Sequence, residues 1–472
     1  MKRIAIIGGG IAGLAAALVL EKQRAQGAAL EYTLFESNFR LGGVVVTEHV
    51  DGCVLEAGPD SFLSEKPWAT DFCREIGLGD QLIGSNDPDR KTYILVKGKL
   101  VAIPDGLMFM VPTKVLPAIR SPLFSMSTKL RIAQEWFHPP HQAEHDESVA
   151  EMVGRHFGTE MVECLVDPLL SGVYGGDATQ LSVRAVLPRF AEMEAKHGSL
   201  SRALQAARKE TGRPPARPLF TSLKDGMQQM VDAVVSHLPA SAVRTGVPVQ
   251  LVQKQPGGWL VSAGYASDCF NAVILALPAP AAAELVHTSS VKLASELGAI
   301  QYTSSITVNL GYDRRVRTLL PPGFGLLVPR CEGKNLLAAT FVHNKFPHRV
   351  SDDRALLRCF LGGAGRDQVL QLPDEEVIRA VHHDLRDIIG LTADPLFTRI
   401  HRWKGAMAQY NVGHLDRLQR IDNLLAQLPG LALAGNGYRG IGVPDCIRSG
   451  NEAANRALAA IGLVEAKIPA SA

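Results

Sequence analysis

Three glycines near the start of the chain have the spacing of a phosphate-binding turn. Gly8-x-Gly10-x-x-Gly13 lies between an apolar run at 3–7, which predicts a buried strand, and an Ala/Leu-rich segment at 12–24, which predicts a helix. In such a turn the first glycine permits the tight bend, the second lets backbone approach a pyrophosphate, and the third lets helix and strand pack closely. The helix N-terminus would also offer free N–H groups to the phosphates. The pattern therefore predicts a dinucleotide site.

An acidic residue lies where such a site needs one. Glu36 follows Gly13 by 23 residues and ends a second apolar run, 32–35, so its carboxylate can bind ribose hydroxyls. Gly42 and Gly43 then give a second close approach of the backbone. Strand, helix and strand in this order predict a βαβ unit and an α/β fold. A glycine turn without a ligand is the alternative, and the joint position of strand, helix and acid argues against it.

The composition excludes several classes of protein. A formal net charge of +2, without Lys/Arg runs interleaved with aromatic residues, argues against nucleic-acid binding. Seven scattered cysteines without a CxxC pair suit reduced cytosolic thiols better than disulfides or a zinc site. No stretch of about 20 apolar residues occurs, so no segment is expected to span a membrane. We expect a cytoplasmic protein, and peripheral attachment to the inner face of the membrane stays open.

One histidine cluster has the spacing of metal ligands on a helix. It is His138-x-x-His141-x-x-x-His145. Pro139 and Pro140 break any helix there, and no cysteine or carboxylate pattern completes a site. We therefore interpret 138–147 as a solvated linker and expect no metal.

Further sequence blocks resemble the oxygen-dependent porphyrinogen oxidases of haem synthesis, which belong to the amine oxidase-like FAD superfamily. Three blocks carry the resemblance: EAGPDSFL at 56–63, PLLSGVYGGD at 168–177 and GYRGIGVPDCI at 437–447. Two shorter blocks, FTSLKDGM at 220–227 and QYxxGH at 409–414, extend it through essentially the whole chain. The C-terminal block is the most specific of them.

The resemblance implies that FAD is the cofactor. The N-terminal βαβ unit and a C-terminal strand and helix would hold it jointly. The helix, expected to begin near Val443–Asp445, would direct its N-terminus at the flavin pyrimidine ring and stabilise the negative charge of the reduced flavin. The residues that the resemblance and the glycine motif assign to the cofactor are Gly8, Gly10, Gly13, Glu36, Gly42, Gly43, Val247, Trp403, Gly435 and Val443.

The expected architecture is α/β with three parts. A discontinuous Rossmann-type FAD-binding domain of the amine oxidase-like kind would comprise 1–67, 218–283 and 404–465. A mixed-sheet substrate-binding domain would comprise 68–105 and 284–403, and a mainly helical subdomain 106–217. In the last part, Met108–Phe137 mixes apolar and basic residues, so it could contact an anionic membrane surface, roof the substrate cavity, or do both. Whether the chain forms a homodimer stays open.

The implied reaction is the oxidation of a porphyrinogen to a porphyrin in three two-electron steps. A hydride would leave a meso carbon for flavin N5, and O2 would reoxidise the flavin and yield hydrogen peroxide. Such chemistry needs orientation and electrostatics more than an acid/base pair, and the sequence contains no convincing catalytic triad. Protoporphyrinogen IX and coproporphyrinogen III both remain as substrates.

A porphyrinogen joins carboxylates to a large apolar ring, so its site should combine cations with an apolar cavity. Lys66 matches a basic position of the family and is expected to bind a carboxylate, unless it is an exposed lysine without a role. Gly172 would let the ring lie close to the flavin from a loop, Gly172–Asp177, or would be an ordinary turn glycine. Tyr174 and Phe341 could wall the cavity, although core packing suits Phe341 as well.

Other functions fit the sequence less well. A flavin amine oxidase acting on C–N bonds would show a different glycine-rich block where this chain has AGNGYRGIGVPDC at 434–446. A carotenoid-type desaturase would need a more apolar entrance. A flavoprotein used only for binding would not need the separate substrate-side blocks. The porphyrinogen oxidase is therefore the favoured hypothesis, with the amine oxidase as its alternative.

Overall fold

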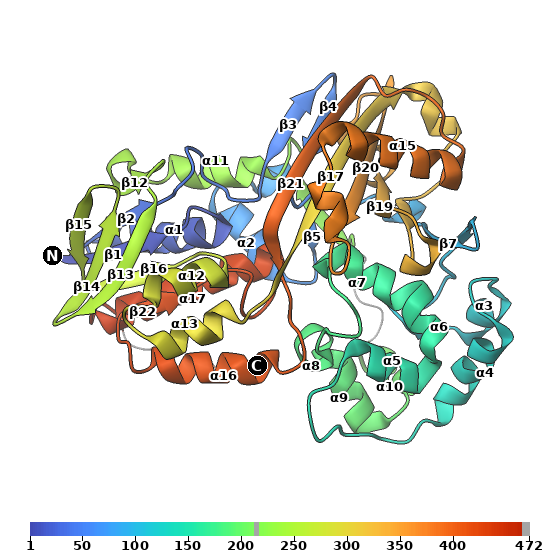
Figure 1. The fold of residues 1–472 in the computed structure, drawn as a ribbon, viewed down its shortest axis with the longest axis horizontal. Coiled ribbons are helices and arrows are strands. Elements are labelled where there is room, and N and C mark those ends of the chain that lie inside the picture. The colour runs from blue at the N-terminus through green and yellow to red at the C-terminus, as the bar shows by residue number, and fades with distance from the viewer. Residues whose placement is uncertain (212–216, 465–472) are drawn as a thin grey trace.

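A five-stranded parallel sheet forms the core of one lobe of the computed structural model, which describes residues 1–211 and 217–464. The strand order is β12-β2-β1-β16-β22, so strands from three distant parts of the chain lie side by side (Figure 1). The central strands are almost fully buried on both faces, as their apolar runs predict. The bounds are β1 Lys2–Ile7, β2 Leu30–Phe35, β12 Val243–Arg244, β16 Ala272–Leu275 and β22 Leu431–Leu433.

Two long helices pack against each other on one face of this sheet. They are α1 (Ile11–Ala25) and α17 (Val443–Ala460), and α11 (Gln228–Ser236) lies beside α1. The two helices approach so closely that a Cβ on Gly450 would lie 2.1 Å from the Ala12 carbonyl oxygen. Glycine at 450 is therefore required by the packing. Alanines fill the rest of this contact, which is why α1 is buried along most of its length.

The opposite face of the sheet is covered by an antiparallel meander and by helices. The indole of Trp259 lies at the centre of this second core and is fully buried. The meander is β13-β14-β15, and α12, α13 and α16 complete the layer. The bounds are β13 Val249–Gln255, β14 Gly258–Ala263, β15 Ala266–Phe270, α12 Ala279–Val286, α13 Val291–Gly298 and α16 His414–Leu425.

A seven-stranded mixed sheet forms the second lobe. Its order is β21-β17-β20-β19-β18-β7-β8, with β18 and β7 parallel and the other pairs antiparallel. Helix α15 (Asp374–Ile389) buries Val377, Val381 and Leu385 in the core of this lobe. The strand bounds are β7 Thr92–Val96, β8 Lys99–Ala102, β17 Tyr302–Asp313, β18 Gly325–Leu327, β19 Leu336–Phe341, β20 Arg354–Gly362 and β21 Phe397–Ala408.

Short helices between residues 115 and 211 form a third body below the mixed sheet (Figure 1). Their bounds are α3 Val115–Arg120, α4 Met126–Gln134, α5 Val149–Phe157, α6 Thr159–Met161, α7 Asp167–Tyr174, α8 Val183–Val186, α9 Pro188–His197 and α10 Leu200–Thr211. A π-helical turn, Val162–Val166, joins α6 to α7. None of the described helices is long and apolar enough to cross a membrane.

One local expectation for this body is wrong, and the linker expected at 138–147 departs from its prediction at one residue. The predicted loop Gly172–Asp177 begins later, because α7 continues to Tyr174 and ends at Gly175 in the left-handed conformation (φ 57°). His138 is not simply solvated, since its ring stacks on that of His156 with centroids 4.1 Å apart. Neither feature could be read from local composition, because both depend on packing against segments elsewhere in the chain.

Short elements connect the lobes. Strand β11 (Phe220–Leu223) lies between β5 (Phe62–Leu63) and β6 (Leu82–Gly84), and a hairpin pairs β3 (Thr47–Val50) with β4 (Cys53–Glu56). Helix α2 (Pro67–Glu75) packs on α17, and α14 (Val342–Lys345) follows β19. A two-stranded ribbon joins β9 (Leu107–Met108) to β10 (Val111–Pro112). The EAGPDSFL block thus passes from β4 to β5, where the two lobes meet.

Candidate functional site

The glycine turn after β1 leaves open space at the position where a phosphate is expected. A Cβ on Gly8, where φ is +107°, would lie 2.3 Å from the Ala276 carbonyl oxygen. A Cβ on Gly13 would lie 1.9 Å from the Gly8 carbonyl oxygen. A Cβ on Gly10 would meet no atom of the described residues within 4 Å. Gly8 and Gly13 are therefore required by packing, whereas Gly10 is free to face a ligand.

The carboxylate of Glu36 lies at the carboxyl end of β2, next to this turn. Its Oε2 accepts the backbone N–H of Gly9 at 2.7 Å, and its Oε1 accepts that of Asn38 at 2.8 Å. Oε2 has one bond from the described residues and retains a lone pair for a hydroxyl donor. The backbone N–H of Val247 donates to the Glu36 carbonyl at 2.9 Å. The structure thus brings Glu36 and Val247 together, although 210 residues separate them in sequence.

Gly42 and Gly43 lie directly over the glycine turn. The N–H of Gly42 donates to the Gly9 carbonyl at 2.8 Å, and a Cβ on Gly43 would lie 3.2 Å from the Gly10 Cα. The guanidinium of Arg40 binds the backbone carbonyls of this loop, including that of Gly43. Its cation therefore adds positive charge to the loop that covers the glycine turn.

The C-terminal strand and helix return to the same edge of the sheet. Gly435 follows β22 with φ +122°, and its N–H donates to Ser449 Oγ at 3.1 Å. After Gly442, helix α17 begins at Val443 with no side chain of the preceding residues capping it. Both α1 and α17 follow a parallel strand, so their N-terminal ends lie at the same edge of the sheet. Two positive dipole ends and an acidic ribose acceptor fit FAD.

A tyrosine and a histidine hold the loop that leads into α17. Tyr410 Oη donates to the Asn436 carbonyl at 2.7 Å and accepts the N–H of Gly440 at 2.8 Å. His414 Nε2 lies 2.8 Å from the Tyr438 carbonyl, and the His414 and Tyr410 rings stack with centroids 4.1 Å apart. The QYxxGH block therefore supports the GYRGIGVPDCI block. Both blocks are visible in the sequence, whereas the contact between them is not.

Lys66 does not stand alone at the site. Its Nζ lies 2.6 Å and 2.8 Å from the carboxylate oxygens of Asp445, in the first turn of α17. The Asp445 side chain is 5% exposed and that of Lys66 39%. Asp445 was not among the predicted site residues. An acid in the fourth position of the GVPD turn was visible in the sequence, but its partner lies 379 residues away.

Tyr174 lies near this ion pair, Gly172 precedes that tyrosine by two residues on α7, and Phe341 does not line the site. Burial and the charge of Asp445 raise the pKa of Tyr174 to about 12, so its phenol is neutral and close to that carboxylate. Gly172 is exposed in the last turn of α7, and a Cβ there would lie 3.8 Å from Leu327. Phe341 is fully buried in the core of the mixed sheet. It therefore has no free surface for a ligand, which corrects the expectation that it walls a cavity.

The EAGPDSFL block is fixed by buried charges where the lobes meet. Asp60 Oδ2 accepts from Lys345 Nζ at 2.8 Å and lies 3.7 Å from Arg358 Nη1. Burial opposes ionisation of Asp60, but these two cations outweigh it and hold the pKa of that carboxyl well below its ordinary value. Trp403 Nε1 donates to the Ala57 carbonyl at 2.8 Å. Trp403 thus lies against this block, and its predicted contact with the cofactor stays a prediction.

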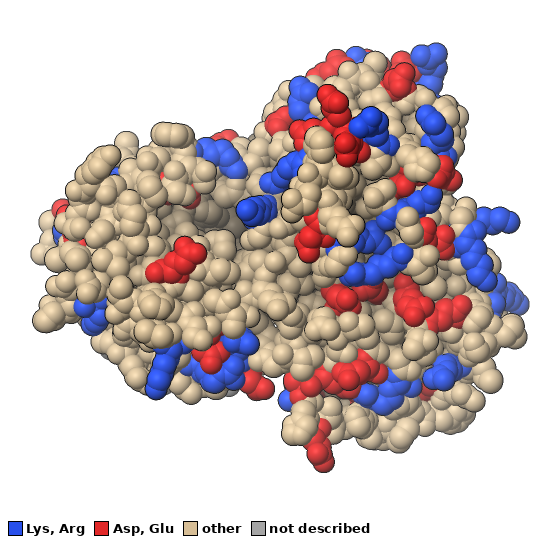
Figure 2. Space-filling view, viewed as in Figure 1, with Lys and Arg blue, Asp and Glu red and all other residues tan. Residues whose placement is uncertain are grey.

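The surface is hollowed between the two sheet lobes, and Lys and Arg side chains lie at the rim (Figure 2). The glycine turn, the ribose acceptor and the N-termini of α1 and α17 meet at one edge of the parallel sheet, and the lysine–aspartate pair lies at the first turn of α17. The arrangement can hold an anionic dinucleotide and place an anionic second ligand beside it. It offers no nucleophile hydrogen-bonded to an oriented base among the groups described here.

Comparisons with known proteins agree with this geometry. The sequence profile described as flavin containing amine oxidoreductase matches residues 11–458. A coproporphyrinogen III oxidase of Bacillus subtilis (strain 168) is 33% identical, covering 97% of this chain and 98% of that protein. The chloroplastic protoporphyrinogen oxidase of Nicotiana tabacum is 29% identical, covering 95% of this chain and 84% of that protein.

Solved structures share the fold over nearly the whole chain. A protein of Exiguobacterium sp. 255-15 superposes with a TM-score of 0.86 at 33% identity, covering 95% of this chain and 97% of that one. Cyclohexylamine oxidase of Brevibacterium oxydans superposes with a TM-score of 0.68 at 19% identity, covering 96% and 98%, which shows the fold alone. The chain belongs to the flavin containing amine oxidoreductase family.

Proposed function

We propose that this chain is an FAD-dependent porphyrinogen oxidase of haem biosynthesis that uses O2 as electron acceptor. The observation that carries the proposal is the meeting of Gly10, Glu36 and the N-terminus of α17 at one edge of the parallel sheet. Full-length similarity to coproporphyrinogen III and protoporphyrinogen oxidases supports the substrate class. When bound, FAD supplies the hydride acceptor and is reoxidised by O2 to give hydrogen peroxide.

The residues of the chain hold and orient the reactants in this proposal. Backbone N–H groups at the start of α1 bind the pyrophosphate, and Glu36 binds the ribose. The remaining proposed cofactor contacts are Gly8, Gly13, Gly42, Gly43, Val247, Trp403, Gly435 and Val443. The first turn of α17 stabilises negative charge on the reduced pyrimidine ring. Tyr410 and His414 keep that turn in position.

The proposed substrate contacts lie on three elements. Lys66 Nζ has three N–H donors and gives two to Asp445, so one is free for a substrate carboxylate. Tyr174 presents an apolar ring beside α17. Gly172 lacks a side chain at the exposed end of α7 and lets the macrocycle approach. The parts 1–67, 218–283 and 404–465 would act as cofactor domain, 68–105 and 284–403 as substrate domain, and 106–217 as helical subdomain.

We favour coproporphyrinogen III as the substrate. Relatives of that name from Bacillus subtilis, Propionibacterium freudenreichii and Mycobacterium tuberculosis are 31–33% identical to this chain over 97% of its length. The tobacco protoporphyrinogen oxidase is 29% identical, and the coproporphyrinogen III oxidase of Staphylococcus aureus is 28% identical. Initial rates on coproporphyrinogen III and protoporphyrinogen IX, measured in parallel by porphyrin fluorescence, test the choice. A larger kcat/KM for protoporphyrinogen IX would reverse it.

The same assay tests the reaction class. Purified protein should carry FAD, and porphyrinogens should be oxidised in air faster than they autoxidise. Primary amines and polyamines should leave the flavin oxidised. Bleaching of the flavin by an amine, with no acceleration of porphyrin formation, would favour the C–N oxidase alternative instead.

Peripheral contact with an anionic membrane is a further part of the proposal. Exposed apolar side chains project from α3, α4 and the turn after α4, at Leu116, Met126, Leu130 and Phe137. Phe137 is 80% and Met126 76% exposed. Cations lie on the same segment at Arg120 and Arg131, which suits insertion beside anionic headgroups. Co-sedimentation with phosphatidylglycerol vesicles should fall on replacing Met126 and Phe137 by Ser.

A further inference from the structure

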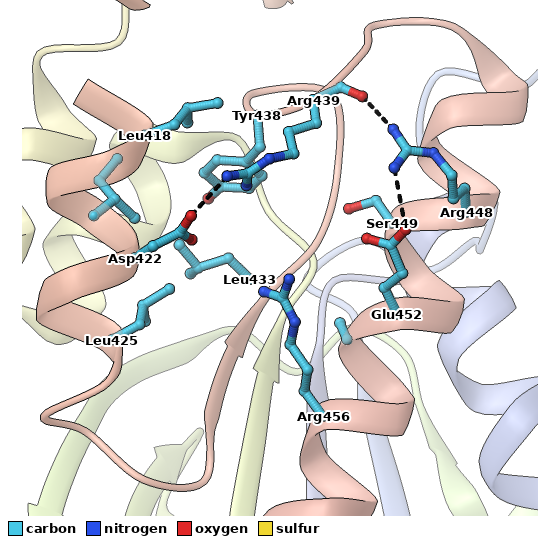
Figure 3. A pocket seen from close by; sticks show the side chains of 12 residues that line it. Leu418, Asp422, Leu425, Leu433, Tyr438, Arg439, Arg448, Ser449, Glu452 and Arg456 are labelled. Carbon is cyan, nitrogen blue, oxygen red and sulfur yellow. Dashed lines mark hydrogen bonds and ion pairs between the residues drawn. The ribbon is translucent and has the colours of Figure 1, made fainter. Parts of the chain in front are cut away.

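A small pocket between α16 and α17 gathers hydrogen-bond donors that lack acceptors (Figure 3). It lies at the edge of the parallel sheet formed by β22. On α17 the lining residues Ser449, Glu452, Ala453 and Arg456 follow the i, i+3, i+4, i+7 spacing of one helix face. Gly450, on the neighbouring face, contacts α1. The pocket therefore lies on a different side of α17 from the glycine turn.

The hydroxyl of Tyr438 is the first donor. The side chain lines the pocket and is 6% exposed, yet its Oη has no hydrogen-bond partner among the residues that the structure describes. Buried hydroxyls are almost always bonded. Burial also raises the pKa of Tyr438 well above its ordinary value, so the hydroxyl keeps its proton and can donate it.

Two arginines and a serine supply further donors. Arg448 Nε is buried and unpartnered within the described part of the chain. Arg456 forms no ion pair or hydrogen bond in residues 1–211 and 217–464, and its guanidinium points between Leu433 and Glu452 (Figure 3). Ser449 Oγ accepts from the Gly435 N–H, so its own proton is available.

The carboxylates of the pocket already have cationic partners. Arg439 binds Asp422 at 2.6 Å, and Arg448 binds Glu452 at 3.1 Å. Three arginines therefore face two carboxylates, which leaves one positive charge uncompensated at Arg456. The free space is about 30 Å³, larger than the roughly 10–15 Å³ that one water needs. A charged acceptor of a few atoms matches both the charge and the donors.

We propose that this pocket binds a small oxyanion, a carboxylate or phosphate group, through Arg456, Tyr438 and Ser449. Arg456 is exposed, so the anion reaches the pocket from solvent along that side chain. Tyr438 and Arg439 belong to the loop that leads into α17, and Ser449 holds Gly435. A bound anion would thus join α17 to this loop, on a different side of α17 from the glycine turn.

Direct binding to the FAD-loaded protein tests the proposal. Inorganic phosphate and acetate are titrated separately by isothermal calorimetry at constant ionic strength, which distinguishes the two sources of an oxyanion. Saturable one-site binding of either probe is expected. Arg456→Ala should weaken it roughly tenfold or more, because a charge-assisted hydrogen bond is lost. Tyr438→Phe should weaken it by a smaller factor.

The control removes the same charge from a distant surface. Arg379 is exposed on α15, lies 3.8 Å from Glu376 and does not line the pocket. The Arg379→Ala variant should therefore bind the anion with the same affinity as the unmodified protein. Circular dichroism shows whether the Tyr438→Phe variant folds. If that variant does not fold, the affinity of the Arg456→Ala variant decides whether the proposal holds. Absence of saturable binding for both probes, or equal affinity in Arg456→Ala, would overturn the proposal and leave a water-filled pocket.

Discussion

The Lys66 ammonium lies 2.6 Å from a carboxylate oxygen of Asp445, which joins the start of α2 to the first turn of α17. An acid in this turn opposes the negative charge that the helix end is proposed to stabilise on reduced flavin. Lys66 balances that acid while its own side chain stays 39% exposed. One lysine can therefore neutralise Asp445 and also meet a substrate carboxylate.

Replacing Lys66 by Ala should raise KM for coproporphyrinogen III and lower the midpoint potential of bound FAD. The first effect follows from loss of a carboxylate partner, and the second from an uncompensated Asp445. We expect a loss of roughly 1–2 kcal/mol in kcat/KM, because the lysine is partly exposed. Combining Asp445→Asn with Lys66→Ala should restore the potential but not KM. An unchanged KM in the single variant would remove Lys66 from the substrate site.

Substitutions of two glycines in the first turn should have different effects, one on cofactor binding and the other on folding. Gly10→Ala places a methyl group in open space, so the unloaded protein should keep its melting temperature while the Kd for FAD rises roughly 10–100-fold as the pyrophosphate is displaced. Gly13→Ala places its Cβ 1.9 Å from a backbone oxygen and should destabilise the unloaded protein itself. Thermal unfolding with and without FAD measures both. Equal FAD affinity in Gly10→Ala would contradict the assigned phosphate position.

Removing the Tyr410 hydroxyl should loosen the loop that leads into α17. Tyr410→Phe leaves the Asn436 carbonyl and the Gly440 N–H without their bonds in a buried setting, which costs about 1–3 kcal/mol. We expect a lower melting temperature and faster release of FAD, followed by flavin fluorescence. The matched control is Tyr265→Phe, since Tyr265 is fully exposed. A release rate equal to that of the control would show that Tyr410 does not position the loop.

Local patterns predicted the fold class and the glycine turn of this protein correctly. The turn from Gly8 to Gly13 depends on contacts between near neighbours, so its spacing alone specifies its geometry. The α/β class follows from the same unit together with the C-terminal strand. The ion pair of Lys66 and Asp445 could not be predicted, because it depends on how α2 and α17 pack across 379 residues.

Two expectations for the substrate site were less accurate, because they too depend on packing between distant parts of the chain. Phe341 lies in an apolar strand whose two faces cannot be told apart by alternation alone, and the structure places its ring in the core. Gly172 lies in a glycine-rich block that suggested a loop, yet packing extends α7 to Tyr174. The glycine that ends the helix is Gly175, which has a positive φ, whereas Gly172 does not.

A buried charge cluster in the helical body should make the stability of the protein depend on pH. His156 Nδ1 lies 3.2 Å from Glu135, and its Nε2 lies 2.9 Å from Glu194, which Arg155 also binds. Burial disfavours the imidazolium, but the bonds to the two glutamates outweigh it and raise the pKa of His156. The same bonds, opposed by burial, lower the pKa values of Glu135 and Glu194.

The directions of these pKa shifts determine the pH range in which the cluster stabilises the folded protein. The raised pKa of His156 adds stability below its unfolded value of 6.5, and this is lost as pH rises through the folded value. The lowered pKa values of Glu135 and Glu194 add stability above 4.5, and this is lost as pH falls. The contribution of the cluster is therefore greatest between these two values.

His156→Gln should accordingly destabilise the protein most between about pH 5 and 6.5, by roughly 1–3 kcal/mol, because it removes the cation that Glu135 binds and leaves Glu194 with Arg155 alone. The difference from the unmodified protein should shrink as pH rises above that range. Urea unfolding at several pH values measures it, with His287→Gln on the exposed end of α12 as the matched control. A difference independent of pH would mean that His156 is neutral in the folded protein and that packing alone accounts for its effect.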